Sequence, residues 1–269
     1  MRDSRQVLAY LDRLAVARPP VVDAAALRTL HRAHLLAVPF ENLSIHLGEP
    51  VSLDPPALLD KLVGRRRGGF CYELNGAFAL LLESLGCRVA RLAARVFGPA
   101  GLGPPFDHLA LLVHPADRSG PWLVDVGFGS HSVFPLRLAL GVEQLDPAGR
   151  FTLVAADGPD GGDVDVLRDG RPQYRLERRE RSLADFVPTC WWQQTSPESH
   201  FARGTVCSRL TEEGRISINN RRLLITRGGD RTERELPTDD ALLAAYRGHF
   251  GIELPRAPGP DSPPGARRP

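Results

Sequence analysis

Cys71 is the residue of this chain best suited to nucleophilic chemistry. It follows Gly68 and Gly69 and stands near the start of an apolar segment, whose hydrophobic residues recur every three or four positions up to Leu85. This spacing predicts an amphipathic helix, with Gly86 where a C-terminal cap is expected. In the first turn of a helix, the free N–H groups and the dipole favour a thiolate. The alternative is a buried structural cysteine, and the local context does not separate the two.

A thiol nucleophile needs a base, and the base needs an acceptor that orients it. His108 begins one predicted strand, and Asp125 lies in the next strand, between Val124 and Val126. A turn centred on Ala116 and Asp117 places the two residues directly opposite each other, whereas other registers do not. The spacing permits a Cys-His-Asp triad of Cys71, His108 and Asp125 without proving it.

The surroundings of Asp125 favour a partner for its carboxylate. An aspartate in an apolar strand is costly to bury alone, and a histidine N–H is a natural partner. Two other interpretations stay open: Asp125 bonds the backbone or an arginine, and His108 is an ordinary histidine at a strand end.

The remaining titratable residues give weaker signals. His31 and His34 share a predicted helix without supporting ligands, so we expect helix-surface or core-edge residues and no metal site. His131 and His200 lie in predicted loops that could line a site. Glu41 and Arg67 are expected to form a structural pair in which Arg67 fixes the loop before Cys71.

Composition describes a soluble globular protein. The chain has 269 residues, of which 42% are hydrophobic and 25% charged, with a net charge of +2. This balance gives no case for nucleic acid or membrane partners, and no apolar stretch approaches the roughly 20 residues of a spanning helix. The charged, amphipathic N-terminus is unlike a secretory signal. The four cysteines lack zinc-ligand or CxxC spacing, which favours free thiols in a reducing cytoplasm.

The hydrophobic period divides the chain into three parts. Residues 1–86 are predicted to be helical, with helices over 5–17, from Asp23, from Asp54 and from Cys71. Strands follow over 89–97, 108–113, 122–126, 151–155, 163–168 and 173–178, which suggests a small barrel or sandwich. From residue 182 we expect a helix over 182–194, a hairpin at Asn219-Asn220, a helix ended by Gly251, and a disordered tail over 255–269.

These residues together resemble the arylamine N-acetyltransferases. The matches begin with the stretches 30–35 and 38–43 and continue with the run 67–75 around the cysteine, with 94–96 and with 108–113. They end with Val124-Asp125-Val126-Gly127-Phe128-Gly129 and with the stretch 195–201. The similarity extends to about residue 254 and makes the triad the expected arrangement.

The resemblance implies an α+β fold with a cysteine-protease-like Cys-His-Asp core. Its parts are a helical bundle with the nucleophile (1–86), a β-barrel with the His and Asp (87–181) and an α/β lid (182–254). It implies acetyl transfer from acetyl-CoA to an arylamine, arylhydrazine or arylhydroxylamine through an acetyl-cysteine, a cytoplasmic reaction of xenobiotic metabolism. Acetyl-CoA is then a substrate, and no tightly bound cofactor or metal is expected.

The resemblance also assigns roles. Cys71 becomes the acetylated nucleophile, largely a thiolate paired with an imidazolium on His108, and Asp125 orients that base. Phe40, Val96 and Phe128 match acceptor-pocket positions, while Gly127, Gly129 and Ser130 match a loop near the coenzyme. The Cys71 backbone N–H is one expected oxyanion donor.

Other functions compete with this one. Amide synthases that cyclise ansamycin-type polyketides look similar and use the same triad, but take their acyl group from a carrier protein. A transglutaminase-like or papain-like protease shares the triad logic. A binding module without catalysis would have no need of Cys71, His108 and Asp125 together.

Overall fold

Helices fill the first part of the chain, where apolar residues recur with helical spacing. The computed structural model describes residues 4–157 and 162–259. The helical elements here are α1 (Ser4–Arg13), α2 (Ala24–Ala37), α3 (Leu43–Leu47), α4 (Pro55–Leu59), a π-helical turn (Asp60–Gly64) and α5 (Cys71–Ser84). Asp23 caps α2 as predicted, since its carboxylate accepts the N–H of Ala26 at 2.7 Å. The first helix is shorter than predicted, because the chain turns after Arg13 and Ala15 adopts a left-handed φ of 55°.

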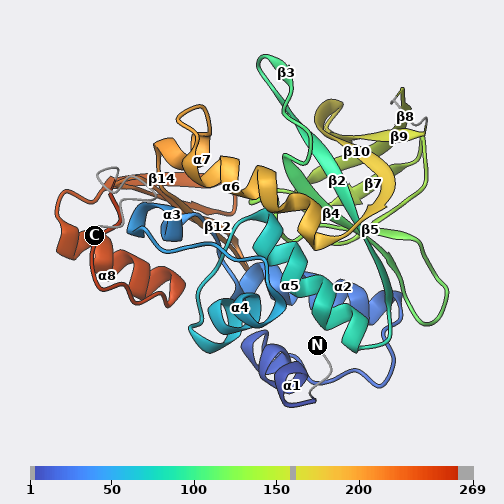
Figure 1. Cartoon of the computed structure of the whole chain (residues 1–269), viewed down its shortest axis with the longest axis horizontal. Helices are drawn as coiled ribbons and strands as arrows, with labels where there is room; N and C mark the ends of the chain where they lie inside the picture. The colour runs from blue at the N-terminus through green and yellow to red at the C-terminus, as the bar shows by residue number, and fades with distance from the viewer. Residues whose placement is uncertain (1–3, 158–161, 260–269) are drawn as a thin grey trace.

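Helix α5 passes through the middle of the molecule, between the other helices and the large sheet (Figure 1). All of its residues from Cys71 to Leu82 are buried. The prediction of this helix is confirmed, and Gly86 follows its C-cap with a φ of 94°.

The middle of the chain forms a nine-stranded antiparallel sheet that nearly closes into a barrel. Its order is β6-β5-β4-β2-β10-β9-β8-β7, with β3 beside β2. The strands are β2 (Arg88–Gly98), β3 (Gly101–Leu102), β4 (His108–His114), β5 (Trp122–Val124), β6 (Leu136–Arg137), β7 (Glu143–Asp146), β8 (Gly149–Ala156), β9 (Asp163–Arg168) and β10 (Arg171–Arg181). Side chains alternate along these strands, so one face packs an apolar interior that includes Phe151, Tyr174 and Leu176.

A second sheet of five strands lies in the C-terminal part. The elements are η2 (Leu183–Phe186), α6 (Val187–Thr195), α7 (His200–Arg203), β11 (Val206–Thr211), β12 (Gly214–Asn219), β13 (Arg222–Arg227), β14 (Asp230–Glu235) and α8 (Asp239–Phe250). The predicted hairpin at Asn219-Asn220 joins β12 to β13, and Gly251 ends α8 with a φ of 66°. Residues 260–269 of the predicted tail lie outside the described residues.

One short strand from the helical part joins the second sheet. β1 (Phe40–Glu41) pairs with β11, and Leu43 and Leu47 of α3 pack in the same apolar cluster as Tyr246 of α8. The segment 40–47 therefore packs with the C-terminal elements, although the sequence pattern predicts only helices before residue 86. None of the helices in the described residues has the length and apolar character needed to cross a bilayer.

Candidate active site

His108 and Asp125 meet on one face of the large sheet. Nε2 of His108 lies 2.7 Å from Oδ2 of Asp125, and both side chains are buried. The register pairs Leu111 with Val124, so its continuation sets Asp125 opposite Ala110, diagonal to His108 on the same face. The two residues are not directly opposite, but a diagonal neighbour is still within reach of an imidazole.

Asp125 is held by more than the histidine. Its Oδ1 accepts the side-chain N–H of Asn75 at 2.9 Å and the backbone N–H of Gly127 at 3.0 Å. Burial alone would raise the pKa of Asp125, but the adjacent His108 and these donors hold it well below its ordinary value. The carboxylate is therefore ionised and fixed in position.

Cys71 is brought to this pair by the start of α5. It is the first residue of the helix, and the backbone of Leu109, next to His108, lies near enough to its sulfur to lower the pKa of the thiol. A methyl group at Gly127, two residues after Asp125, would lie 2.8 Å from the Cys71 Cα. Cys71, His108 and Asp125 thus come from the start of α5, the start of β4 and the segment just after β5, which meet at one place.

Asn75 ties α5 to both strands of the site. One turn after Cys71, its side chain donates to the carbonyl of Leu109 at 2.6 Å and accepts the N–H of Val126 at 3.0 Å. Together with its bond to Asp125, these contacts fix the helix start against β4 and the segment after β5. Asn75 stands in the run 67–75 that carries the resemblance. The sequence signal for its role is its position four residues after Cys71, which places both side chains on the same face of the helix.

Burial and nearby charges act on the pKa of the Cys71 thiol. Burial raises the pKa of Cys71 well above its ordinary value, and the carboxylates of Asp107 and Asp125 raise it further. The backbone of Leu109 acts in the opposite direction. Burial therefore opposes ionisation of the thiol, and a resting thiolate paired with an imidazolium on His108 stays a prediction.

Two buried ion pairs support the loop before the nucleophile. Arg67 lies 3.0 Å from the Glu41 carboxylate, as the sequence predicted, and Lys61 lies 2.7 Å from Glu73. Glu73 also accepts the N–H of Phe70 at 3.2 Å, at the start of α5. The pair of Lys61 and Glu73 was not expected, because the two residues stand on different elements.

Aromatic rings surround the imidazole. Phe128 meets His108 edge-on, with ring centroids 5.1 Å apart, and the Tyr174 ring lies 5.2 Å away on the barrel side. Ala94 stands opposite His108 in β2, and its small side chain leaves room for Tyr174, which pairs with Val96. Tyr174 was not among the predicted site residues, because its strand reaches the site only across β2.

The remaining predicted binding residues differ in how far they are buried. Gly127 is buried against α5, and Gly129 has a φ of 86°, where an added methyl group would lie 3.4 Å from the Phe40 ring. Ser130 is exposed. Val96 is half-buried and its carbonyl accepts the N–H of Gly103 at 2.8 Å.

The other histidines fall into three environments. His31 and His34 are fully buried, so the expectation of helix-surface or core-edge residues is wrong: His34 bonds the Tyr10 hydroxyl, and His31 bonds the Val133 carbonyl at 2.9 Å. His131 is buried beside Phe128 and Tyr174, whereas His200 is exposed. Within the described ranges, no group of histidines, cysteines and carboxylates is arranged to hold a metal ion.

Sequence comparisons connect this site to known proteins. A family model described as N-acetyltransferase matches residues 23–258. An arylamine N-acetyltransferase of Mycolicibacterium smegmatis is 34% identical over 250 residues, covering 91% of each chain. A Salmonella typhimurium protein named arylamine N-acetyltransferase / N-hydroxyarylamine O-acetyltransferase is 34% identical, covering 91% of this chain and 88% of its own.

Solved structures agree with the sequence matches. The arylamine N-acetyltransferase of Mycobacterium marinum superposes with a TM-score of 0.83 at 36% identity, covering 91% of this chain and 92% of its own. Its complex with CoA gives a TM-score of 0.81 with the same identity and coverage.

Proposed function

The chain belongs to the arylamine N-acetyltransferase family of acyltransferases, and we propose that it moves an acetyl group from acetyl-CoA to an aromatic amine, hydrazine or hydroxylamine through an acetyl-cysteine. The observation that carries the proposal is the convergence of three side chains. The Cys71 sulfur lies beside the residue that follows His108, and His108 is bonded to a buried Asp125. This is the arrangement that thiol acyl transfer requires.

In the first half-reaction, Cys71 attacks the thioester. Asp125 occupies Nε2 of His108, which leaves Nδ1 for the thiol proton. Cys71 gives its proton to this nitrogen, so that the proposed resting pair is largely a thiolate and an imidazolium, and Sγ then bonds to the acetyl carbon. The bond from that carbon to the CoA sulfur then breaks, and the imidazolium returns the proton to the departing thiolate.

In the second half-reaction, an uncharged amine attacks the acetyl-cysteine. His108 accepts the proton from the amine nitrogen. The bond between the acetyl carbon and Sγ then breaks, and the proton on His108 is shared again with Cys71. Cys71 is the first residue of α5, so its N–H has no partner within the helix and can donate to the oxyanion in both halves.

Aromatic side chains beside the triad suit an aromatic acceptor. Phe40, Val96 and Phe128 are the proposed acceptor contacts, supported by the edge-on contact of Phe128 with the base. Gly127, Gly129 and Ser130 are the proposed coenzyme contacts. The Mycobacterium marinum relative has been solved in complex with CoA, which supports CoA as the ligand but does not locate its contacts in this chain.

Organisation and compartment remain part of the proposal. The division into a helical part, a barrel and a C-terminal lid at about residues 86 and 181 is part of the proposal, and the apolar cluster inside the barrel, which draws only on residues 90–176, supports its middle part. All four cysteines are free, which supports a reducing cytoplasm.

Intact mass spectrometry tests the acetyl-cysteine. The protein incubated with acetyl-CoA should gain one acetyl group, mapped to Cys71, and lose it when an aniline or a hydrazide is added. Cys71→Ser should gain none while still folding. Cys87→Ser, which alters a buried cysteine between α5 and β2, should behave like the wild type.

The outcomes separate the candidates. An acetyl label on another residue, or acetyl transfer by the Cys71→Ser variant, would contradict the assignment of Cys71 as the nucleophile. A label that forms only from a carrier-bound polyketide thioester, followed by cyclisation, would identify an amide synthase with a carrier-protein partner instead.

A further inference from the structure

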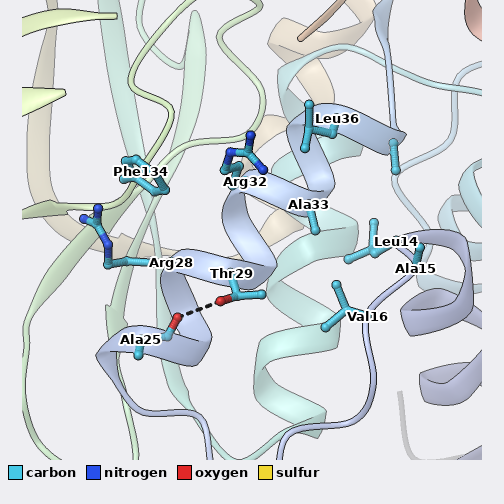
Figure 2. A pocket seen from close by; sticks show the side chains of 11 residues that line it. Leu14, Ala15, Val16, Ala25, Arg28, Thr29, Arg32, Ala33, Leu36 and Phe134 are labelled. Atoms are coloured by element: carbon cyan, nitrogen blue, oxygen red, sulfur yellow. Dashed lines mark hydrogen bonds between the residues drawn. The ribbon is translucent and has the colours of Figure 1, made fainter. Parts of the chain in front are cut away.

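A groove outside the triad runs along the outer side of α2. It has a volume of about 660 Å³, within the range of small-molecule sites, which is roughly 300–1,000 Å³. Helix α2, the connection after α1 and the ring of Phe134 form its walls (Figure 2). None of Cys71, His108 and Asp125 lines it.

The two ends of the groove differ in chemistry. Arg28 and Arg32, one helical turn apart, lie toward the Phe134 end, whereas Leu14, Val16 and Leu36 lie at the other (Figure 2). Ala33 has a small side chain between them, which leaves space along the helix. The Thr29 hydroxyl already donates to the carbonyl of Ala25 at 3.0 Å, so the side-chain donors left for a ligand are those of the two arginines.

The arginines are available to an anion. The Arg28 guanidinium lies 3.9 Å from the Phe134 ring centroid, and within residues 4–157 and 162–259 no carboxylate forms an ion pair with it. Arg32 pairs with Glu212, but both groups are more than a third exposed, and pairs of this kind contribute little. An incoming carboxylate can therefore bind Arg28 and share Arg32.

We propose that this groove binds a medium-chain carboxylate, with its head at Arg28 and Arg32 and its tail along Ala33 toward Val16 and Leu36. Ala37, at the end of the groove, is five positions after Arg32, about 7.5 Å along the helix at 1.5 Å per residue, a length that suits a medium-length alkyl chain. The volume suits a small molecule better than the extended face that a protein partner buries.

Isothermal titration of the full chain with octanoate tests the site. We expect one octanoate per chain and weaker binding at higher salt, because exposed charges are screened. Butyrate, which lacks the tail, and octanol, which lacks the charge, should each bind more weakly. The double variant Arg28→Gln/Arg32→Gln should lose about tenfold or more in affinity, since it removes the charge-assisted bonds.

Two further variants complete the test. Ala33→Phe keeps both arginines but fills the groove, and it should abolish binding. Arg178→Gln, which alters an exposed arginine of β10, should bind like the wild type. Melting curves check that each variant folds. Unchanged affinity in the double variant or in Ala33→Phe would overturn the proposal, as would displacement of octanoate by acetyl-CoA.

Discussion

At the scale of single residues, the fixed ionisation of Asp125 governs the site. Asp125→Asn keeps the shape but removes the charge that orients His108, so activity should fall by about 10⁴, as in comparable triads. Steady-state kinetics with acetyl-CoA and an aniline measures this loss. Asp165→Asn, which breaks a half-buried pair with Arg175, is the matched control and should retain activity.

The same residue predicts a pH dependence of stability. The pKa of Asp125 is held well below its unfolded value of about 3.9, so its contribution is complete above that value and declines as the pH falls toward the folded pKa. The difference in unfolding free energy between the wild type and Asp125→Asn should therefore shrink in acid. Urea unfolding at neutral and acidic pH measures it, and a constant difference would contradict the linkage.

Asp107 should add to the effect of burial, which is the larger cause of the raised pKa of Cys71. Its carboxylate, bonded to the Gln193 amide at 2.7 Å, raises the pKa of the thiol. Asp107→Asn removes the charge and keeps an acceptor for Gln193, so the pH profile of Cys71 alkylation by iodoacetamide should move to lower pH. Asp117→Asn, on the exposed turn between β4 and β5, should leave the profile unchanged. Coincident profiles for Asp107→Asn and the wild type would show that burial alone sets the pKa of this thiol.

At the scale of elements, the approach of the segment after β5 to α5 is the most sensitive contact. A methyl group at Gly127 would lie 2.8 Å from the Cys71 Cα and 2.7 Å from the Asn75 amide, closer than real contacts allow. Gly127→Ala should therefore displace the start of α5 and lower kcat by at least about tenfold, since such misplacements are costly in catalysis.

A second glycine provides the control. Gly248 lies inside α8 with no atom within 4 Å of an added methyl group. Gly248→Ala should leave kcat unchanged and stabilise the protein by about 0.5–1 kcal/mol, because alanine is the better helix former. Equal kinetics in the two variants would mean that the close approach at Gly127 does not position the nucleophile.

Strong periodicity made the long elements predictable. The helix from Cys71, the strands around His108 and the hairpin at Asn219-Asn220 all follow from local pattern and turn chemistry. The two-residue strands β1, β3 and β6 are too short to leave a periodic signal. The diagonal register of His108 and Asp125 depends on turn geometry, which spacing alone leaves open.

The site was predictable to the same extent. Cys71, His108 and Asp125 carry chemistry by residue type, and their order along the chain supports the triad. Asn75 and Tyr174 act through tertiary contacts, so the sequence offers only the spacing of Asn75 from Cys71 as a signal.

At the scale of the whole molecule, the buried pair of Glu41 and Arg67 joins distant parts of the chain. Glu41 also accepts the N–H of Leu43 at 2.7 Å, within the segment that pairs with the C-terminal sheet. Glu41→Gln removes the charge that lies nearest the buried guanidinium and leaves it the longer contacts to Glu49 and Ser44, so the free energy of unfolding should fall by about 3 kcal/mol.

Denaturant titration measures the free energy of unfolding of Glu41→Gln, and a variant of an exposed ion pair is the control. Glu233→Gln removes a partner from Arg222, whose side chain is 65% exposed, and should change stability by less than about 0.5 kcal/mol. Similar small changes in both variants would mean that the buried pair contributes no more than a surface one.

Strand β1 also limits how the molecule can move. Glu41 pairs with Cys207 of the C-terminal sheet, and its N–H donates at 2.8 Å to the carbonyl of Gly69, two residues before the sulfur. A movement of the C-terminal sheet away from α5 would either break these backbone hydrogen bonds or displace the segment that precedes Cys71. The position of the C-terminal sheet is thus coupled, through two residues of backbone, to the position of the nucleophile.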